Sequence, residues 1–186
     1  MIIARQKRKE NISEYLLYMW QVEDLIRANH FDMDSLRRTV ISQYHQSPEM
    51  TKEIEEWYQN LIDMMLSEGV KEKGHIQLNN SVIITLTDLH LRLLKDSKEM
   101  VYGGVYYKTL PYIIQLRARS GGENLSEIET CFNAVYGYLI LKMEGKEISD
   151  GTTEGIKQIS SFLALLASKY KDDMEGKLDE DDINNV

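Results

Sequence analysis

Apolar residues recur at helical spacing through most of this chain, from about Asn11 to about Tyr170. A helix that buries one face repeats its apolar residues every three to four positions, whereas a half-buried strand alternates every second position. No segment shows the alternation of a strand. The pattern therefore predicts an all-α protein whose single domain is an irregular bundle of six to seven helices.

Length and composition indicate that this bundle folds without disulfide bonds. A chain of 186 residues can bury a core of its own, and the single cysteine, Cys131, cannot form an internal disulfide. The longest apolar runs, Tyr15–Trp20 and Phe162–Ala167, have six residues each, far fewer than the roughly 20 that cross a bilayer. The first residues lack the apolar region of a secretory signal. We therefore expect a cytoplasmic protein without a membrane-spanning helix.

Charge is distributed unevenly between the two ends of the chain. Residues 1–10 carry Arg5, Lys7, Arg8 and Lys9, whereas residues 172–186 are strongly acidic and poor in apolar side chains. We expect a basic N-terminal arm over residues 1–10, a helical bundle domain over residues 11–171 and a disordered acidic tail over residues 172–186.

The overall charge limits which partners the protein can bind. The net charge of −8 and the pI of about 5.1 argue against broad contact with nucleic acid, which needs a basic face. The arm residues Arg5, Lys7, Arg8 and Lys9 leave weak nucleic-acid contact open as an alternative. The same arm can also meet the acidic tail of its own chain or of another copy, and the second case would give self-association.

Capping residues and glycines mark the expected helix ends. A polar cap precedes the expected helices at Asn11, Ser47 and Ser126, and Pro48 follows the second of these caps. The signals predict helices over about 11–29, 32–45, 48–68, 79–97, 126–143 and 153–171. Residues 98–120 are expected to form a kinked or divided helix closed by Gly121 and Gly122, because Gly103, Gly104 and Pro111 disfavour a straight one.

Two charged residues interrupt the apolar face of the first of these helices. Glu23 and Arg27 fall among its apolar residues and are four positions apart, a spacing at which they can pair directly. One interpretation is a buried ion pair that fixes helix packing. The other is the polar floor of a ligand cavity, where Arg27 holds an anionic group and Glu23 orients it.

His90 is also expected to lie among apolar residues of its helix, between Leu86 and Leu93. It is interpreted either as a neutral histidine with one hydrogen bond or as a base or ligand facing Glu23. His30, His45 and His75 have no partner at the helical spacing of metal ligands, so no metal or cofactor is expected. Cys131, on the apolar side of its helix, is interpreted as an inert core thiol.

Tyrosines and arginines gather around the expected irregularities of residues 98–120. Such residues suit a polar pocket or a partner-binding surface, but they equally suit the packing of a helix junction. A cavity built on the first, fourth and fifth helices would use the candidate ligand-binding residues Glu23, Arg27, His90, Tyr102, Tyr106, Tyr107 and Arg117.

Three stretches of the sequence resemble a known family. The opening from Ile3 to Ile12, the run from Glu14 to Asp24 and the later Gly103–Tyr107 resemble an uncharacterised family of bacterial all-helical proteins, a domain of unknown function. The resemblance covers the chain to about residue 170. It implies a helical fold and a bacterial, cytoplasmic setting, and because the family has no assigned activity, it implies no catalytic residue.

These observations predict a function without naming a reaction. No reactive constellation of residues is present in the sequence, so the leading prediction is a non-catalytic interaction or regulatory protein that binds an unknown protein partner or itself. The second is a small-molecule-binding protein or enzyme with the polar cavity described above. The third is weak nucleic-acid contact through the arm.

Overall fold

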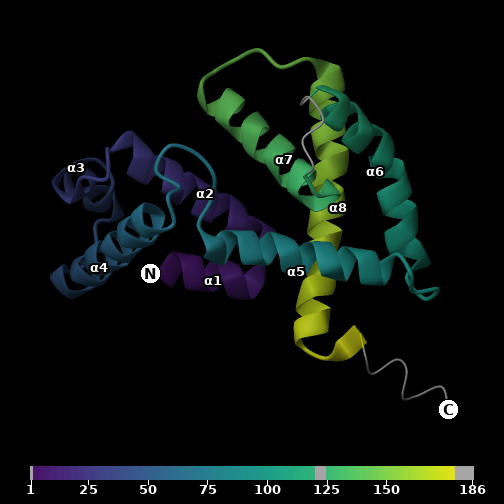
Figure 1. The fold of residues 1–186 in the computed structure, drawn as a ribbon, viewed down its shortest axis with the longest axis horizontal. Helices are drawn as coiled ribbons and strands as arrows, with labels where there is room; N and C mark the ends of the chain where they lie inside the picture. The colour runs from purple at the N-terminus through teal and green to yellow at the C-terminus, as the bar shows by residue number, and fades with distance from the viewer. Residues whose placement is uncertain (1, 120–124, 179–186) are drawn as a thin grey trace. The chain divides into compact units, whose positions relative to one another are not determined.

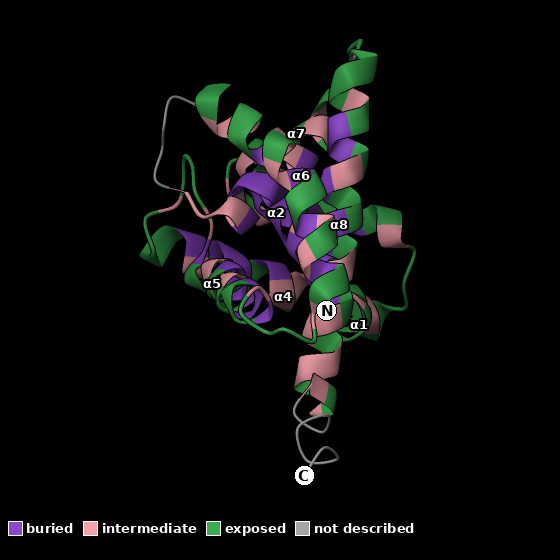
Figure 2. Cartoon of the chain, turned by 90° about the vertical axis from the view of Figure 1, so that its right-hand side faces the viewer, coloured by how far each residue is buried: buried purple, intermediate pink, exposed green. Residues whose placement is uncertain are grey.

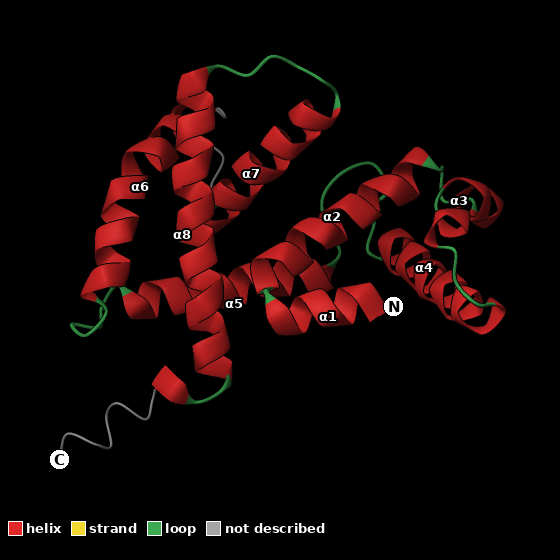
Figure 3. Cartoon of the chain, turned by 180° about the vertical axis from the view of Figure 1, so that it is seen from behind, coloured by secondary structure: helices red, strands yellow, loops and turns green. Residues whose placement is uncertain are grey.

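The described part of the chain is built from helices. The computed structural model describes residues 2–119 and 125–178, and within these ranges there are eight α-helices and no strand (Figures 1 and 3). The helices are α1 (Ile2–Glu10), α2 (Ile12–Ala28), α3 (Met33–Thr39), α4 (Pro48–Ser67), α5 (Gln77–Leu93), α6 (Met100–Arg119), α7 (Glu127–Met143) and α8 (Asp150–Met174), with a 3₁₀ helix, η1 (Ile41–Tyr44), after α3. The all-α prediction is confirmed. The predicted count of six to seven was low because the expected basic arm is itself a helix, α1.

The three helix caps predicted from the sequence are all present. The hydroxyl of Ser47 accepts a hydrogen bond from the amide of Met50 at 3.3 Å, and that of Ser126 accepts from Glu129 at 3.1 Å. At the start of α2, the side chain of Asn11 accepts from the amide of Ser13 at 2.9 Å. Each cap satisfies an amide that has no partner inside its helix.

Other helix ends differ from the prediction. Helix α5 begins at Gln77, so Asn79, where the sequence predicted the helix to start, is a buried residue of its first turn. Helix α8 begins at Asp150, because Ser149 caps it, and continues to Met174 into the segment predicted to be disordered. Gly121, Gly122 and residues 179–186 lie outside the described residues.

Helix α6 is one helix and is not divided. It runs through Gly103, Gly104 and Pro111 and bends along its length (Figures 1 and 3). Its inner face buries Tyr102 and Ile113. Packing of that face outweighs the low helix propensity of glycine and proline, which is a weak local preference that tertiary contacts override.

Contacts divide the chain into two compact units. The first contains the described residues up to Glu10 together with Glu14–Val82, in which α3, η1 and α4 pack together. The second contains Asn11–Ser13 together with the described residues from Ile83 onward. Ser13 belongs to the second unit because its hydroxyl donates to the carbonyl oxygen of Leu163 in α8, at 3.2 Å.

Three helices make up most of the second unit, together with the part of α5 that follows Val82. Helices α6, α7 and α8 pack against one another, and the large buried side chains among them include Tyr102, Phe132 and Phe162. Figure 2 shows buried and exposed residues alternating around α8, as expected for a helix with one face on a core. In the first unit the largest buried side chains are Trp20 and Tyr58.

Candidate functional site

Glu23 lies at the centre of a polar cluster in the first unit. Its side chain, on α2, is 0% exposed. One carboxylate oxygen, Oε1, accepts from the amide of Ile76 at 3.0 Å and from Nδ2 of Asn79 at 2.8 Å. The other, Oε2, lies 2.5 Å from Nδ1 of His75. We call Glu23, His75, Ile76 and Asn79 the Glu23 cluster; it fixes the start of α5 to α2.

His75 is one of the members of this cluster that the sequence did not indicate. Its ring stacks on the indole of Trp20, with centroids 4.1 Å apart and planes 8° from parallel. The histidine therefore covers the apolar face of α2 while its nitrogen reaches the carboxylate. No helical spacing predicts this contact, because His75 lies in the loop before α5 and meets Glu23 across 52 positions of sequence.

Arg27 does not form the direct pair with Glu23 that the spacing predicted. In the described ranges its guanidinium pairs with Asp24 at 2.8 Å and donates to the carbonyl oxygens of Val70, at 3.1 Å, and of Gly74. Gly74 adopts a φ of +86°, which favours glycine, so its carbonyl is presented by a turn that other residues resist. The long side chain thus places the guanidinium on Asp24 and on two loop carbonyls instead of on Glu23.

The Glu23 cluster and Arg27 therefore act on the same loop. Both bind the segment between α4 and α5, Glu23 through amide and side-chain donors and Arg27 through carbonyl acceptors. These contacts fix the packing of the loop, but the direct Glu23–Arg27 ion pair of the packing interpretation is absent from the described residues. The alternative in which they form the floor of a ligand cavity stays a prediction.

His90 lies at the centre of a second cluster, in the second unit. Its Nδ1 is 2.7 Å from the hydroxyl of Tyr102, and its Nε2 is 3.7 Å from the carboxylate of Glu127. The hydroxyl of Tyr106 donates to the same carboxylate at 2.8 Å. We call His90, Tyr102, Tyr106 and Glu127 the His90 cluster; Phe162 packs edge-on to the imidazole at 5.6 Å.

Burial sets the protonation of the His90 cluster. It lowers the pKa of His90, and the nearby Glu127 carboxylate opposes that shift only in part. Burial also raises the pKa of the Tyr102 and Tyr106 phenols. At neutral pH the imidazole and both phenols are therefore uncharged, as expected for polar groups shielded from water. Glu127 was missed because it lies in the first turn of α7, where an acidic residue is an ordinary helix-start signal.

The remaining candidate residues have other surroundings. Tyr107 points outward from α6 and is 66% exposed, whereas the guanidinium of Arg117 donates to the carbonyl oxygen of Leu125. The predicted set thus includes Glu23 and Arg27 in the first unit, and His90, Tyr102 and Tyr106 brought together in the second. Cys131 is buried, and burial raises the pKa of its thiol to about 12.

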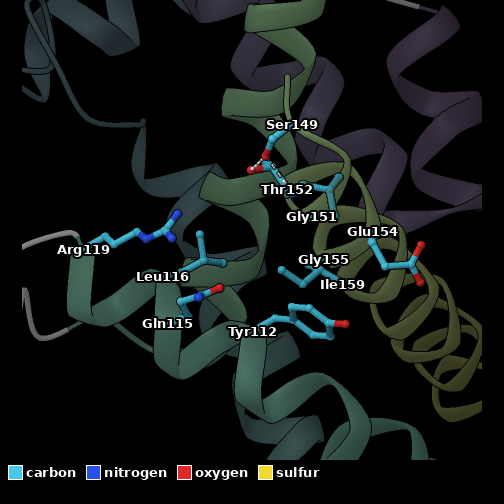
Figure 4. Close-up of a pocket in the computed structure, with 11 residues that line it drawn as sticks. Tyr112, Gln115, Leu116, Arg119, Ser149, Gly151, Thr152, Glu154, Gly155 and Ile159 are labelled. Atoms are coloured by element: carbon cyan, nitrogen blue, oxygen red, sulfur yellow. Dashed lines mark hydrogen bonds between the residues drawn. The ribbon is translucent and has the colours of Figure 1, made fainter. Parts of the chain in front are cut away.

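A hollow of about 440 Å³ opens between α6 and the start of α8 in the second unit (Figure 4). The ring of Tyr112 lies against Gly155. A Cβ atom at position 155 would lie 2.9 Å from Cδ1 of Tyr112, so only glycine leaves room for the ring. Arg119 and Glu154 lie on opposite sides of the hollow. In the described ranges, no group of three or more histidines, cysteines or acids is arranged to hold a metal ion.

The outward side of α6 is apolar along its whole length. Residues at alternating spacings of four and three all lie on this exposed side, and we call them the α6 stripe: Met100, Gly104, Tyr107, Pro111, Ile114 and Ala118. Met100 and Ile114 are 79% and 58% exposed. Although the chain has 30 acidic residues, none lies in α6, whose charged side chains are one lysine and two arginines.

The predicted arm residues lie on helix α1 in the first unit. Lys7 pairs with Glu14 at 3.0 Å, and Lys9 is exposed. Arg5 and Arg8, one helical turn apart, both line a second hollow, and the guanidinium of Arg8 lies 5.6 Å from the centre of the Tyr15 ring.

Comparisons with known proteins identify the family. No described helix combines the length and the apolar character needed to cross a membrane. No curated protein and no solved structure matched the chain. Residues 1–177 match the family described as "Domain of unknown function (DUF4924)", which covers almost the whole sequence. The chain therefore belongs to this family, whose function is unknown.

Proposed function

We propose that the protein is a non-catalytic interaction protein of the bacterial cytoplasm that binds an amphipathic helix of a partner protein through the α6 stripe. The observation that carries the proposal is the exposed, acid-free outward side of α6. Apolar residues at alternating spacings of three and four form the seam along which two helices pack. Gly104 and Ala118 are small enough to let a second backbone approach closely.

Charge on α6 favours one kind of partner. Lys108 is exposed beside the α6 stripe, and Arg119 is exposed at the end of the helix. A partner helix with acidic residues next to its apolar seam complements these cations, whereas a basic one is repelled. Because α6 carries no acid, a second copy of α6 lacks that complement.

The size of the α6 stripe indicates a reversible complex. A helix of 20 residues is about 30 Å long, so a strip about 10 Å wide covers roughly 300 Å². This is the size of the largest apolar patch on many monomers and is small for a permanent complex. The regular spacing and the absence of acids support the proposal more than the area does.

Site-specific photocrosslinking in the source cells tests this function. A photoreactive phenylalanine at Tyr107 should capture one partner peptide whose apolar residues repeat every three to four positions between acidic ones. The same group at Leu91, an exposed leucine of α5, is the matched control and should not capture it. Replacing Ile114 with Asp should abolish capture at position 107, and Leu91→Asp should leave it unchanged. Equal capture at both positions, or capture only within the chain or by a second copy, would refute the proposal.

A further inference from the structure

The second hollow, in the first unit, combines an apolar interior with a cationic mouth. It has a volume of about 260 Å³ and lies among α1, α2, α4 and the start of α5. Its apolar wall includes the buried side chains of Tyr15, Met19 and Leu61 and the exposed Leu78. We call this hollow the α1 slot.

Two arginines lie where the α1 slot meets solvent. Arg5 and Arg8 line it and are exposed, and among the described residues neither forms an ion pair. No acidic residue lines the α1 slot. Lys7, on the same helix, is instead paired with Glu14. The two guanidiniums are therefore available to an anion from outside the chain, which they can hold through planar, charge-assisted hydrogen bonds.

The shape restricts what such an anion can be. At about 260 Å³ the α1 slot lies just below the roughly 300 Å³ at which pockets for drug-sized ligands begin. A flexible thioether such as Met19, beside the aromatic rings of Tyr15 and Trp57, adapts to a slender apolar group. A small inorganic anion would leave the apolar wall uncovered, whereas an acyl chain covers it.

We infer that the α1 slot binds a free medium-chain fatty carboxylate, with the acyl chain against Met19, Leu61 and Leu78 and the carboxylate held by Arg5 and Arg8. The interior supplies affinity by removing methylene groups from water, and the arginines supply selection for an anionic head. This site is independent of the α6 stripe, which lies on the other unit.

Calorimetric titration of the full chain with decanoate, below its micelle concentration, tests the site. Saturable binding of one decanoate is expected, with decanol at least tenfold weaker because it lacks the charge. The double variant Arg5→Gln, Arg8→Gln should weaken decanoate binding at least tenfold. Arg38→Gln, at an exposed arginine of α3 outside the α1 slot, is the matched control and should leave binding unchanged.

A variant of the apolar wall separates the slot from a general attraction of anions. Leu78→Glu changes an exposed residue, so the fold should persist while decanoate binding is lost. The inference is overturned if decanoate does not bind saturably, if decanol binds equally well or if the arginine variant binds normally. Binding to phosphatidylglycerol vesicles without saturable binding of free decanoate would also overturn it, by placing the cations on a lipid surface.

Discussion

The Glu23 and His90 clusters place a polar side chain on an apolar helix face in two different ways. Glu23 is a carboxylate that accepts from three donors, all of which come from the segment at the start of α5. His90 is a neutral ring held by a phenol and packed among aromatic side chains. The comparison teaches that one buried polar group anchors a loop, whereas the other completes an aromatic core.

The largest expected effect is at Glu23. Replacing Glu23 with Leu leaves the Ile76 amide, the Asn79 amide group and His75 without their acceptor, so we expect a loss of roughly 3–5 kcal/mol in the free energy of unfolding. Urea denaturation measures it. Glu53→Leu, at an exposed glutamate of α4, is the control and should change stability by less than about 0.5 kcal/mol. A loss below about 1 kcal/mol at Glu23 would remove its anchoring role.

Arg27 should matter less. Arg27→Leu removes the donor to the carbonyls of Val70 and Gly74 but leaves every hydrogen bond of Glu23 in place, so we expect a loss of about 2 kcal/mol. The same urea experiment measures it. If the loss equals that of Glu23→Leu, Arg27 compensates the carboxylate directly, as the four-residue spacing originally suggested.

The next effect, at the His90 cluster, is a dependence of stability on pH. Because burial places the folded pKa of His90 below its ordinary value of 6.5, the unfolded chain takes up the proton first as pH falls. The stability that the neutral His90 contributes is fully present above about pH 6.5 and is lost progressively as the pH falls below it. Between about pH 7.5 and about pH 5.5, the wild type should therefore lose more stability than His90→Gln. Equal losses in the two proteins would show that His90 titrates normally.

The smallest expected effect is at Tyr102. Tyr102→Phe keeps the ring but removes the hydroxyl that bonds Nδ1 of His90, so stability should fall by about 1 kcal/mol. Thermal unfolding at neutral pH measures the change, with Tyr107→Phe as the exposed control. A change no larger than that of the control would mean that the hydrogen bond between Tyr102 and His90 adds nothing to stability.

Local signals predicted the helices but not the contacts between them. Capping at Ser47 and Ser126 and the burial of His90 depend on residues a few positions apart, so the sequence carries them directly. The partners of Glu23 depend on where the loop before α5 lies in space. Asn79 shows the difference: local signals indicated only that a helix starts near it, whereas its side-chain amide donates to a buried carboxylate 56 positions away.

The sequence indicated which residues could form a site, but not which of them lie together. Four tyrosines around Gly103 and Pro111 suggested one site, yet the helical turn sends Tyr102 and Tyr106 inward and Tyr107 outward. The α6 stripe went unnoticed because two glycines and a proline suggested an interruption of the helix. Once α6 is continuous, the same residues form a regular exposed seam.

The stack of His75 on Trp20 gives the molecule an optical reporter of its own. An indole in face-to-face contact with an imidazole changes its emission when that ring moves away. Trp20 is one of two tryptophans, and Trp57 lies on α4. In a Trp57→Phe background, fluorescence would follow the loop before α5 as it attaches to α2, without any added dye.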